Sequence, residues 1–201
     1  IIASDGAAED DFGQSVDISG DYAIVGAPDT DDSGTNSGSA YIFHRTGENS
    51  WDSGTEIAAP AADANGSDFF GSAVAISGEY AVAGLPDNDA NNGAGNAYVF
   101  HRSGTNTWDD GTELVPAGGE SADEFGESVA IDGDYIVLGS PNDEVSRVDT
   151  GSAYVFRRTG TNSWDSGTTI FDSSGKDGDQ FGTSVGISGD YIVVGARYND
   201  S

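Results

Sequence analysis

The chain has 201 residues, 30 of them glycine, and its 35 acidic and 7 basic residues give a formal net charge of −28. A polyanion of this kind repels nucleic-acid phosphates and anionic lipid surfaces, so we expect no nucleic-acid partner. The absence of cysteine excludes disulfides and thiol chemistry. No apolar run is long enough to span a bilayer, so no membrane insertion is expected of this segment.

One sequence pattern recurs four times along the chain. It opens with Phe-Gly, continues as an apolar strand, turns at a short link that contains Gly, and ends on a second apolar strand. The copies begin 58, 55 and 56 residues apart, at Phe12, Phe70, Phe125 and Phe181. A repeat of this length indicates an architecture built from one supersecondary unit.

Four strands are predicted in each unit. In the first unit they cover residues 12–19, 22–28, 38–45 and 55–60, which are rich in Val, Ile, Tyr and Phe. The Ser-Gly-Asp link after the first strand suits a tight hairpin with Gly at positive φ. Four antiparallel strands repeated radially predict an all-β fold, a β-propeller made of four-stranded blades. A β-sandwich needs no internal repeat, and a parallel β-helix uses shorter coils, so both are weaker alternatives.

The repeated words resemble the FG-GAP repeat of integrin α-subunit propellers and of microbial surface proteins. They are Phe12-Gly13 with Gly26-Ala27-Pro28, Phe70-Gly71 with Gly84-Leu85-Pro86, Phe125-Gly126 with Gly139-Ser140-Pro141, and Phe181-Gly182 with Gly195-Ala196-Arg197. The resemblance implies a ring of about seven blades, of which this chain would form a part. A four-bladed ring closed by the N-terminal strand is the alternative.

The repeat divides the chain into one propeller segment over residues 1–201. The predicted parts are the outer strand of a preceding blade (1–4), three blades (12–60, 70–117 and 125–173) and an incomplete fourth blade (181–201).

The charge composition predicts adaptation to high salt. Aspartate is abundant and only one residue, Lys176, is lysine, which is typical of halophilic proteins. Because salt screens the repulsion between like charges, we expect the stability of the fold to depend on salt.

Acidic loops are predicted to gather on one face of the blades, where the second strand leads to the third and the fourth leads to the next unit. Alternate oxygen-bearing residues followed by Gly can wrap around Ca²⁺. The candidate ligands are Asp29, Asp31 and Ser33 in the first loop and Asp87, Asp89 and Asn91 in the second. The alternative is a set of solvated loops with Asx-turns. The calcium-binding loops of integrins lie elsewhere, between the first two strands, and have no matching residues here.

Two other repeated features have both structural and functional interpretations. An Asp stands two residues before each Phe-Gly pair, at Asp10, Asp68, Asp123 and Asp179, and we favour a turn-capping role over a ligand role. Trp51, Trp108 and Trp164 occupy one loop of each blade on the opposite face. They could be platforms for sugars, but their identical placement favours hydrophobic plugs.

No catalytic set is predicted. Ser184 lies in a Gly-x-Ser-x-Gly word, but its counterparts show that this word is only the first strand of the repeat. His44 and His101 share their place with Arg157, which favours a solvated or paired strand end over an acid–base catalyst.

The resemblance therefore implies a non-enzymatic, extracellular or cell-surface scaffold for binding or adhesion, which presents its loops to a protein partner, with Ca²⁺ stiffening the acidic loops. Two alternatives remain. A structural subunit of a surface layer or filament would self-associate, and a glycan-binding, lectin-like propeller would use the tryptophan face.

Overall fold

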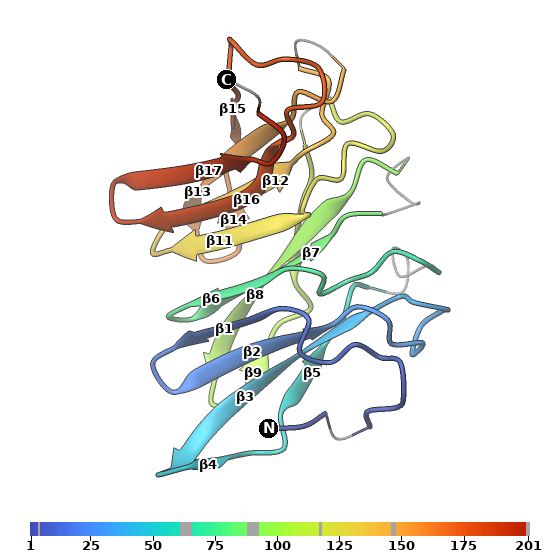
Figure 1. The fold of residues 1–201 in the computed structure, drawn as a ribbon. Coiled ribbons are helices and arrows are strands. Elements are labelled where there is room, and N and C mark those ends of the chain that lie inside the picture. The colour runs from blue at the N-terminus through green and yellow to red at the C-terminus, as the bar shows by residue number, and fades with distance from the viewer. Residues whose placement is uncertain (4, 61–65, 88–92, 117, 146–147, 200–201) are drawn as a thin grey trace.

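The computed structural model describes the chain except for residues 4, 61–65, 88–92, 117, 146–147 and 200–201. Every regular element in the described part is a β-strand (Figure 1), which confirms the all-β prediction. Three sheets and one hairpin follow one another along the chain, and we refer to them as blades 1 to 4.

The strands fall within the ranges predicted for the blades. Blade 1 contains β1 (Val16–Ser19), β2 (Tyr22–Ala27), β3 (Ser39–Gly47), β4 (Ser50–Trp51) and β5 (Thr55–Ile57). Blade 2 contains β6 (Val74–Ser77), β7 (Tyr80–Leu85), β8 (Asn96–Gly104), β9 (Thr107–Trp108) and β10 (Thr112–Leu114). Blade 3 contains β11 (Ser128–Asp132), β12 (Tyr135–Ser140), β13 (Ser152–Gly160), β14 (Ser163–Trp164) and β15 (Thr168–Ile170). Blade 4 contains β16 (Phe181–Ser188) and β17 (Tyr191–Ala196).

Each complete blade is an antiparallel meander in which the second strand lies between the first and the third. In blade 1, β2 pairs with both β1 and β3. The link between β1 and β2 has Gly20 at φ 60°, the left-handed conformation that the sequence predicted for this tight hairpin. Because the strands pair antiparallel within every blade, the fold is not a parallel β-helix.

The predicted fourth strand, residues 55–60, is shorter than expected, and an additional short strand precedes it. In blade 1, β4 pairs with the end of β3 and β5 pairs with its beginning. Between them, Oδ1 of Asp52 accepts hydrogen bonds from the backbone N–H groups of His44 and Gly54, each at 3.0 Å. These bonds turn the chain out of the ladder, so the prediction of a single strand over residues 55–60 was incomplete, and Trp51 lies in a strand instead of a loop.

The Phe-Gly and Gly-x-Pro words join neighbouring blades. Within blade 2, the N–H of Gly71 donates to the carbonyl oxygen of Gly84 at 2.9 Å. The Gly71 carbonyl oxygen also packs against blade 1, where a Cβ on Gly26 would come within 2.0 Å of it. Phe70 is fully buried and packs edge-on against Phe100, with ring centroids 6.1 Å apart. Glycine therefore allows close backbone approach at this junction, and Phe70 packs in the hydrophobic cluster that blades 1 and 2 share.

The hydrophobic core lies between blades. Tyr22 and Ile24 of β2 pack in one cluster with Val74 and Ile76 of β6, and a second cluster joins blades 2 and 3 in the same way. Blades 1 and 4 lie at opposite ends of this stack (Figure 1). The sheets therefore form an open, propeller-like series, and the alternative closed ring of four blades is not formed.

One side of the stack carries the loops between the second and third strands together with the segments that lead into each Phe-Gly pair. We call this side the loop face. The two kinds of segment are bonded to each other: the N–H groups of Phe69 and Phe70 donate to the carbonyl oxygens of Asn36 and Ser37, both at 3.1 Å. The tight hairpins lie on the opposite side, the hairpin face. The predicted sorting of the loops into two faces is therefore confirmed.

The predicted outer strand over residues 1–4 stays a prediction. Residues 1–3 belong to no strand in the described structure. Ile1, Ile2 and Ala3 nevertheless line a groove with Trp51, just as β5 lines a groove with Trp108 of the next blade.

Candidate functional site

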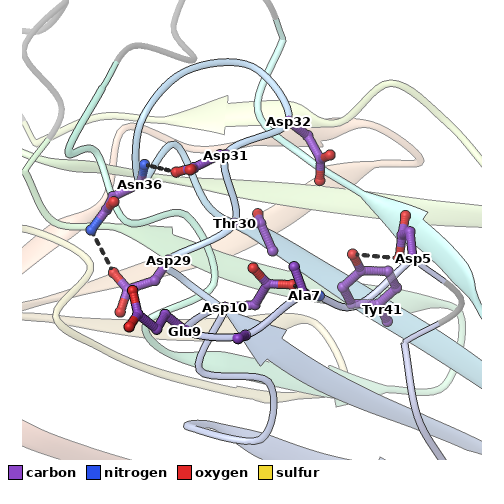
Figure 2. Close-up of a pocket in the computed structure, with 11 residues that line it drawn as sticks. Asp5, Ala7, Glu9, Asp10, Asp29, Thr30, Asp31, Asp32, Asn36 and Tyr41 are labelled. Atoms are coloured by element: carbon purple, nitrogen blue, oxygen red, sulfur yellow. Dashed lines mark hydrogen bonds between the residues drawn. The ribbon is translucent and has the colours of Figure 1, made fainter.

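The loop face of blade 1 contains an acidic pocket with a volume of about 380 Å³ (Figure 2). Six of its eleven lining residues are acidic and none is basic. The lining residues are Asp5, Ala7, Ala8, Glu9, Asp10, Asp29, Thr30, Asp31, Asp32, Asn36 and Tyr41. They come from the N-terminal segment, from the loop after β2 and from β3, so the pocket depends on the packing of all three.

Hydrogen bonds within the loop after β2 fix two of the predicted calcium ligands. Asn36 has φ 55°; its side-chain amide donates to Oδ1 of Asp29 at 2.9 Å, and its backbone N–H donates to Oδ1 of Asp31 at 2.8 Å. The backbone N–H of Ser33 donates to the Ser37 hydroxyl at 3.2 Å. Burial and the neighbouring Asp11 carboxylate raise the pKa of Asp29. The Asx-type contacts match the solvated-loop interpretation, and the role of these residues in metal binding stays a prediction.

Only one residue of the second predicted ligand set lies in the described part of the chain. Asp87 follows β7, whereas Asp89 and Asn91 lie outside the described residues. Burial raises the pKa of Glu124 and of Glu127, and the Asp87 carboxylate adds to both effects. Asp87 therefore lies in an acidic environment between blades 2 and 3.

A tighter group of carboxylates shares Asp5 and Asp32 with the blade 1 pocket. One carboxylate oxygen from each of Asp5, Asp32 and Glu56 lies within 4.8 Å of the other two. The Tyr41 hydroxyl donates to Oδ1 of Asp5 at 3.0 Å, and the Ser39 hydroxyl donates to Oε1 of Glu56 at 2.8 Å. Burial raises the pKa of Glu56, and the charges of Asp32 and Asp5 raise it further. This arrangement can bind a cation through oxygen atoms.

Sequence reasoning missed this group because its members come from three separate segments. Asp5 lies before the first repeat, and Glu56 lies in β5. Asp32 lies in the predicted loop, but between two of the alternate positions predicted to be ligands, Asp31 and Ser33. Glu56 reaches the site because it is the register partner of Tyr41. That pairing is the signal that could have identified Glu56, and it requires knowing the register of the short fourth strand.

In three of the four copies, the Asp before the Phe-Gly pair caps a turn, as expected. Oδ2 of Asp10, Asp123 and Asp179 accepts a hydrogen bond from the backbone N–H three residues earlier, at 2.5, 2.6 and 2.7 Å respectively. Asp68 is likewise buried. Burial, together with the charges of Asp143, Glu120 and Glu144, raises the pKa of Asp123 to about 6.

Trp108 and Trp164 lie between blades, whereas Trp51 packs on the core of blade 1. Trp108 of blade 2 packs edge-on against Tyr22 of blade 1, with ring centroids 6.3 Å apart. The Arg102 guanidinium lies 4.2 Å from the centroid of the same Tyr22 ring, a cation–π contact. Trp164, Arg158 and Tyr80 repeat this arrangement one blade later. The indole nitrogens of Trp108 and Trp164 are buried, which supports the hydrophobic-plug interpretation over a sugar platform.

The residues considered for catalysis have structural contacts. His44 stacks on Tyr22 with ring centroids 4.7 Å apart, and Ser184 is the ladder partner of Gly195 in the β16–β17 hairpin. In the described part of the chain, no helix could cross a membrane.

The family comparison matches the whole series of blades. The FG-GAP repeat model matches four segments, residues 1–43, 55–100, 108–156 and 164–201. A search of the curated proteins finds no significant match. The four segments cover most of the chain, and each contains one of the Phe-Gly pairs that the fold places between blades. The chain belongs to the FG-GAP repeat family.

Proposed function

We propose that this chain is a non-enzymatic, extracellular or cell-surface scaffold for binding or adhesion, which presents its loop face to a protein partner. FG-GAP repeat proteins are typically extracellular or surface-associated and generally non-enzymatic, and their propellers suggest binding or adhesion. The proposal applies these family properties to this chain.

The distribution of repeated and variable residues carries the proposal. The words shared by all four copies, such as Phe70-Gly71 and Gly84, make contacts between blades. The residues that differ between copies gather in the loops of the loop face, as in residues 29–37 and 142–145. Variable loops on a rigid framework are the usual place for binding specificity. The acidic lining of the pocket in blade 1 favours a partner surface that carries basic groups.

The test compares two charge-neutralised variants with the unaltered chain. The loop-face variant carries Asp29→Asn, Asp31→Asn and Glu144→Gln, and the hairpin-face variant carries Glu48→Gln, Asp110→Asn and Asp190→Asn. Both remove three exposed or half-exposed charges, so their net charges are equal. Fluorescent chain is titrated onto intact cells of its source at high salt, before and after protease treatment of the cell surface.

Saturable binding that protease treatment and the loop-face changes both weaken, and that the hairpin-face changes leave intact, supports the proposal. Binding that is absent, resists protease, or responds equally to both variants would overturn it. Loss of binding after periodate treatment alone would instead favour the glycan-binding alternative.

A second candidate, a self-associating subunit of a surface layer or filament, is favoured by the two ends of the stack. Ile18 on β1 is 63% exposed and Val193 on β17 is 72% exposed. Their counterparts, Ile76 and Ile24, pack in one cluster between blades 1 and 2. One copy could therefore dock head to tail on the next by repeating this internal interface.

Sedimentation at high salt tests this second candidate. Concentration-dependent oligomers that Ile18→Asp and Val193→Asp both abolish support it. A monomer at all concentrations contradicts it.

A further inference from the structure

Blade 3 contains a pocket at the position that matches the blade 1 pocket, so the two can be compared directly. From the first segment to the last short strand, each residue of blade 3 lies 113 positions after its counterpart in blade 1, as Phe125 does after Phe12. The matching pocket, about 280 Å³ in volume, is lined by Gly118, Glu120, Asp143, Glu144, Val145, Tyr154 and Thr169. The two pockets therefore share one backbone framework and differ in their side chains.

In blade 3 a single carboxylate accepts hydrogen bonds from both the Ser152 and the Tyr154 hydroxyl groups. Oδ2 of Asp143 accepts hydrogen bonds from the Ser152 hydroxyl at 2.6 Å and from the Tyr154 hydroxyl at 2.8 Å. The counterparts of Asp5, Asp32 and Glu56 are Gly118, Val145 and Thr169, none of which is charged.

In blade 1 the same two hydroxyls bond to two different carboxylates, and a third carboxylate is added. Tyr41 donates to Asp5, Ser39 donates to Glu56, and Asp32 completes the group within 4.8 Å. No basic residue lines the blade 1 pocket. Like charges at this separation repel one another, and a bound cation would offset that repulsion because it attracts all three carboxylates.

Thr30 supplies an independent observation. It is the counterpart of Asp143 and lines the blade 1 pocket. The Thr30 side chain is 3% exposed, and its hydroxyl oxygen has no hydrogen-bond partner. Figure 2 shows it in the middle of the pocket, between Asp32 and Asp10. A buried hydroxyl without a partner is costly, and a bound ion or its water would remove that cost.

We propose that Asp5, Asp32 and Glu56 bind a Ca²⁺ ion, with the Thr30 hydroxyl and water supplying further oxygens. Ca²⁺ takes oxygen ligands at about 2.3–2.6 Å in flexible geometry, so oxygens up to 4.8 Å apart can share one ion. Mg²⁺ demands shorter bonds and stricter octahedral geometry. The ion would join the N-terminal segment, the loop after β2 and β5. The proposal concerns the site alone and holds whichever partner the loop face binds.

Calorimetric titration of the whole chain with CaCl₂, in molar NaCl to screen nonspecific attraction, tests the proposal. Saturable binding of one strongly bound ion is expected. Asp32→Asn and Glu56→Gln should each weaken it about tenfold or more, since each removes a charged ligand. The matched control is Asp31→Asn in the same loop. Asp31 is bonded to the Asn36 backbone, and asparagine retains an acceptor oxygen, so binding should persist.

Thr30→Val, which replaces the hydroxyl with a methyl of similar size, should weaken binding without lowering the melting temperature of the ion-free chain. Circular dichroism spectra of the variants show that each one folds. The absence of saturable heat would overturn the proposal, as would binding that survives Asp32→Asn and Glu56→Gln together. Loss of binding in Asp31→Asn equal to that in Asp32→Asn would also overturn it, because the ion would then be held by the loop alone. Tighter binding of MgCl₂ than of CaCl₂ would overturn the assignment of Ca²⁺.

Discussion

Gly84→Ala should destabilise the fold strongly, because Gly84 meets the backbone of the next blade. A Cβ at Gly84 would lie 2.0 Å from the carbonyl oxygen of Gly126, and real Cβ contacts essentially never fall under 3.0 Å. One of the two backbones must therefore move by about 1 Å at the packed centre of the blade 2–blade 3 interface, where overpacking costs about 3 kcal/mol. For a chain of this size, that cost lowers the melting temperature by about 6–12 °C.

Two matched glycines provide the controls. Gly104→Ala lies in the same blade, where the nearest atom to a new Cβ is 3.5 Å away. Gly195→Ala lies in the same word of the repeat, but its Cβ would meet only the Ser184 side chain at close range. Both variants should shift the melting temperature by less than about 4 °C. Thermal unfolding followed by circular dichroism measures all three. Equal shifts for Gly84→Ala and Gly104→Ala would refute the close-approach argument.

Three further predictions concern hydrogen bonding, pH and salt. Ser128→Ala removes the 2.8 Å bond from the Ser128 hydroxyl to the Gly182 carbonyl oxygen, so urea titration should show a loss of about 1 kcal/mol, and Ala73→Ser at the matching position of blade 2 should show a gain. Burial raises the pKa of Asp123 from 3.8 to about 6; the stability it contributes is present below pH 3.8 and is lost as the pH rises through about 6. Asp123→Asn should therefore reduce the fall in melting temperature across that window, and an unchanged fall would count against the assignment. The melting temperature should be higher in about 3 M than in about 0.1 M NaCl because salt screens the net charge of −28; equal values would contradict this.

The framework of the fold could be predicted from the sequence because the same strand and turn pattern occurs in four copies. The four copies identify the Phe-Gly and Gly-x-Pro words as the shared part of the repeat, and the strands between them as a four-stranded unit. The additional short strand before the fourth, β4, could not be predicted in the same way. It depends on Asp52 accepting two backbone hydrogen bonds, and the repeated Trp-Asp word does not show which N–H groups that carboxylate meets.

The candidate site was less predictable than the framework. Spacing along one loop suggested Asp29 and Asp31, whose carboxylates bond to Asn36 in the same loop. The closest group of carboxylates instead joins Asp5, Asp32 and Glu56 from three segments. Their approach depends on strand register and on the packing of the N-terminal segment, which spacing within a single loop does not reveal.

Comparison of the two charge-neutralised variants on intact source cells tests the central claim most directly. The repeated residues build the blades, and the variable acidic loops are proposed to bind. We therefore predict that Asp29→Asn, Asp31→Asn and Glu144→Gln together weaken binding, while Glu48→Gln, Asp110→Asn and Asp190→Asn together leave it unchanged. Equal binding by both variants, each folded as well as the unaltered chain, would contradict the account.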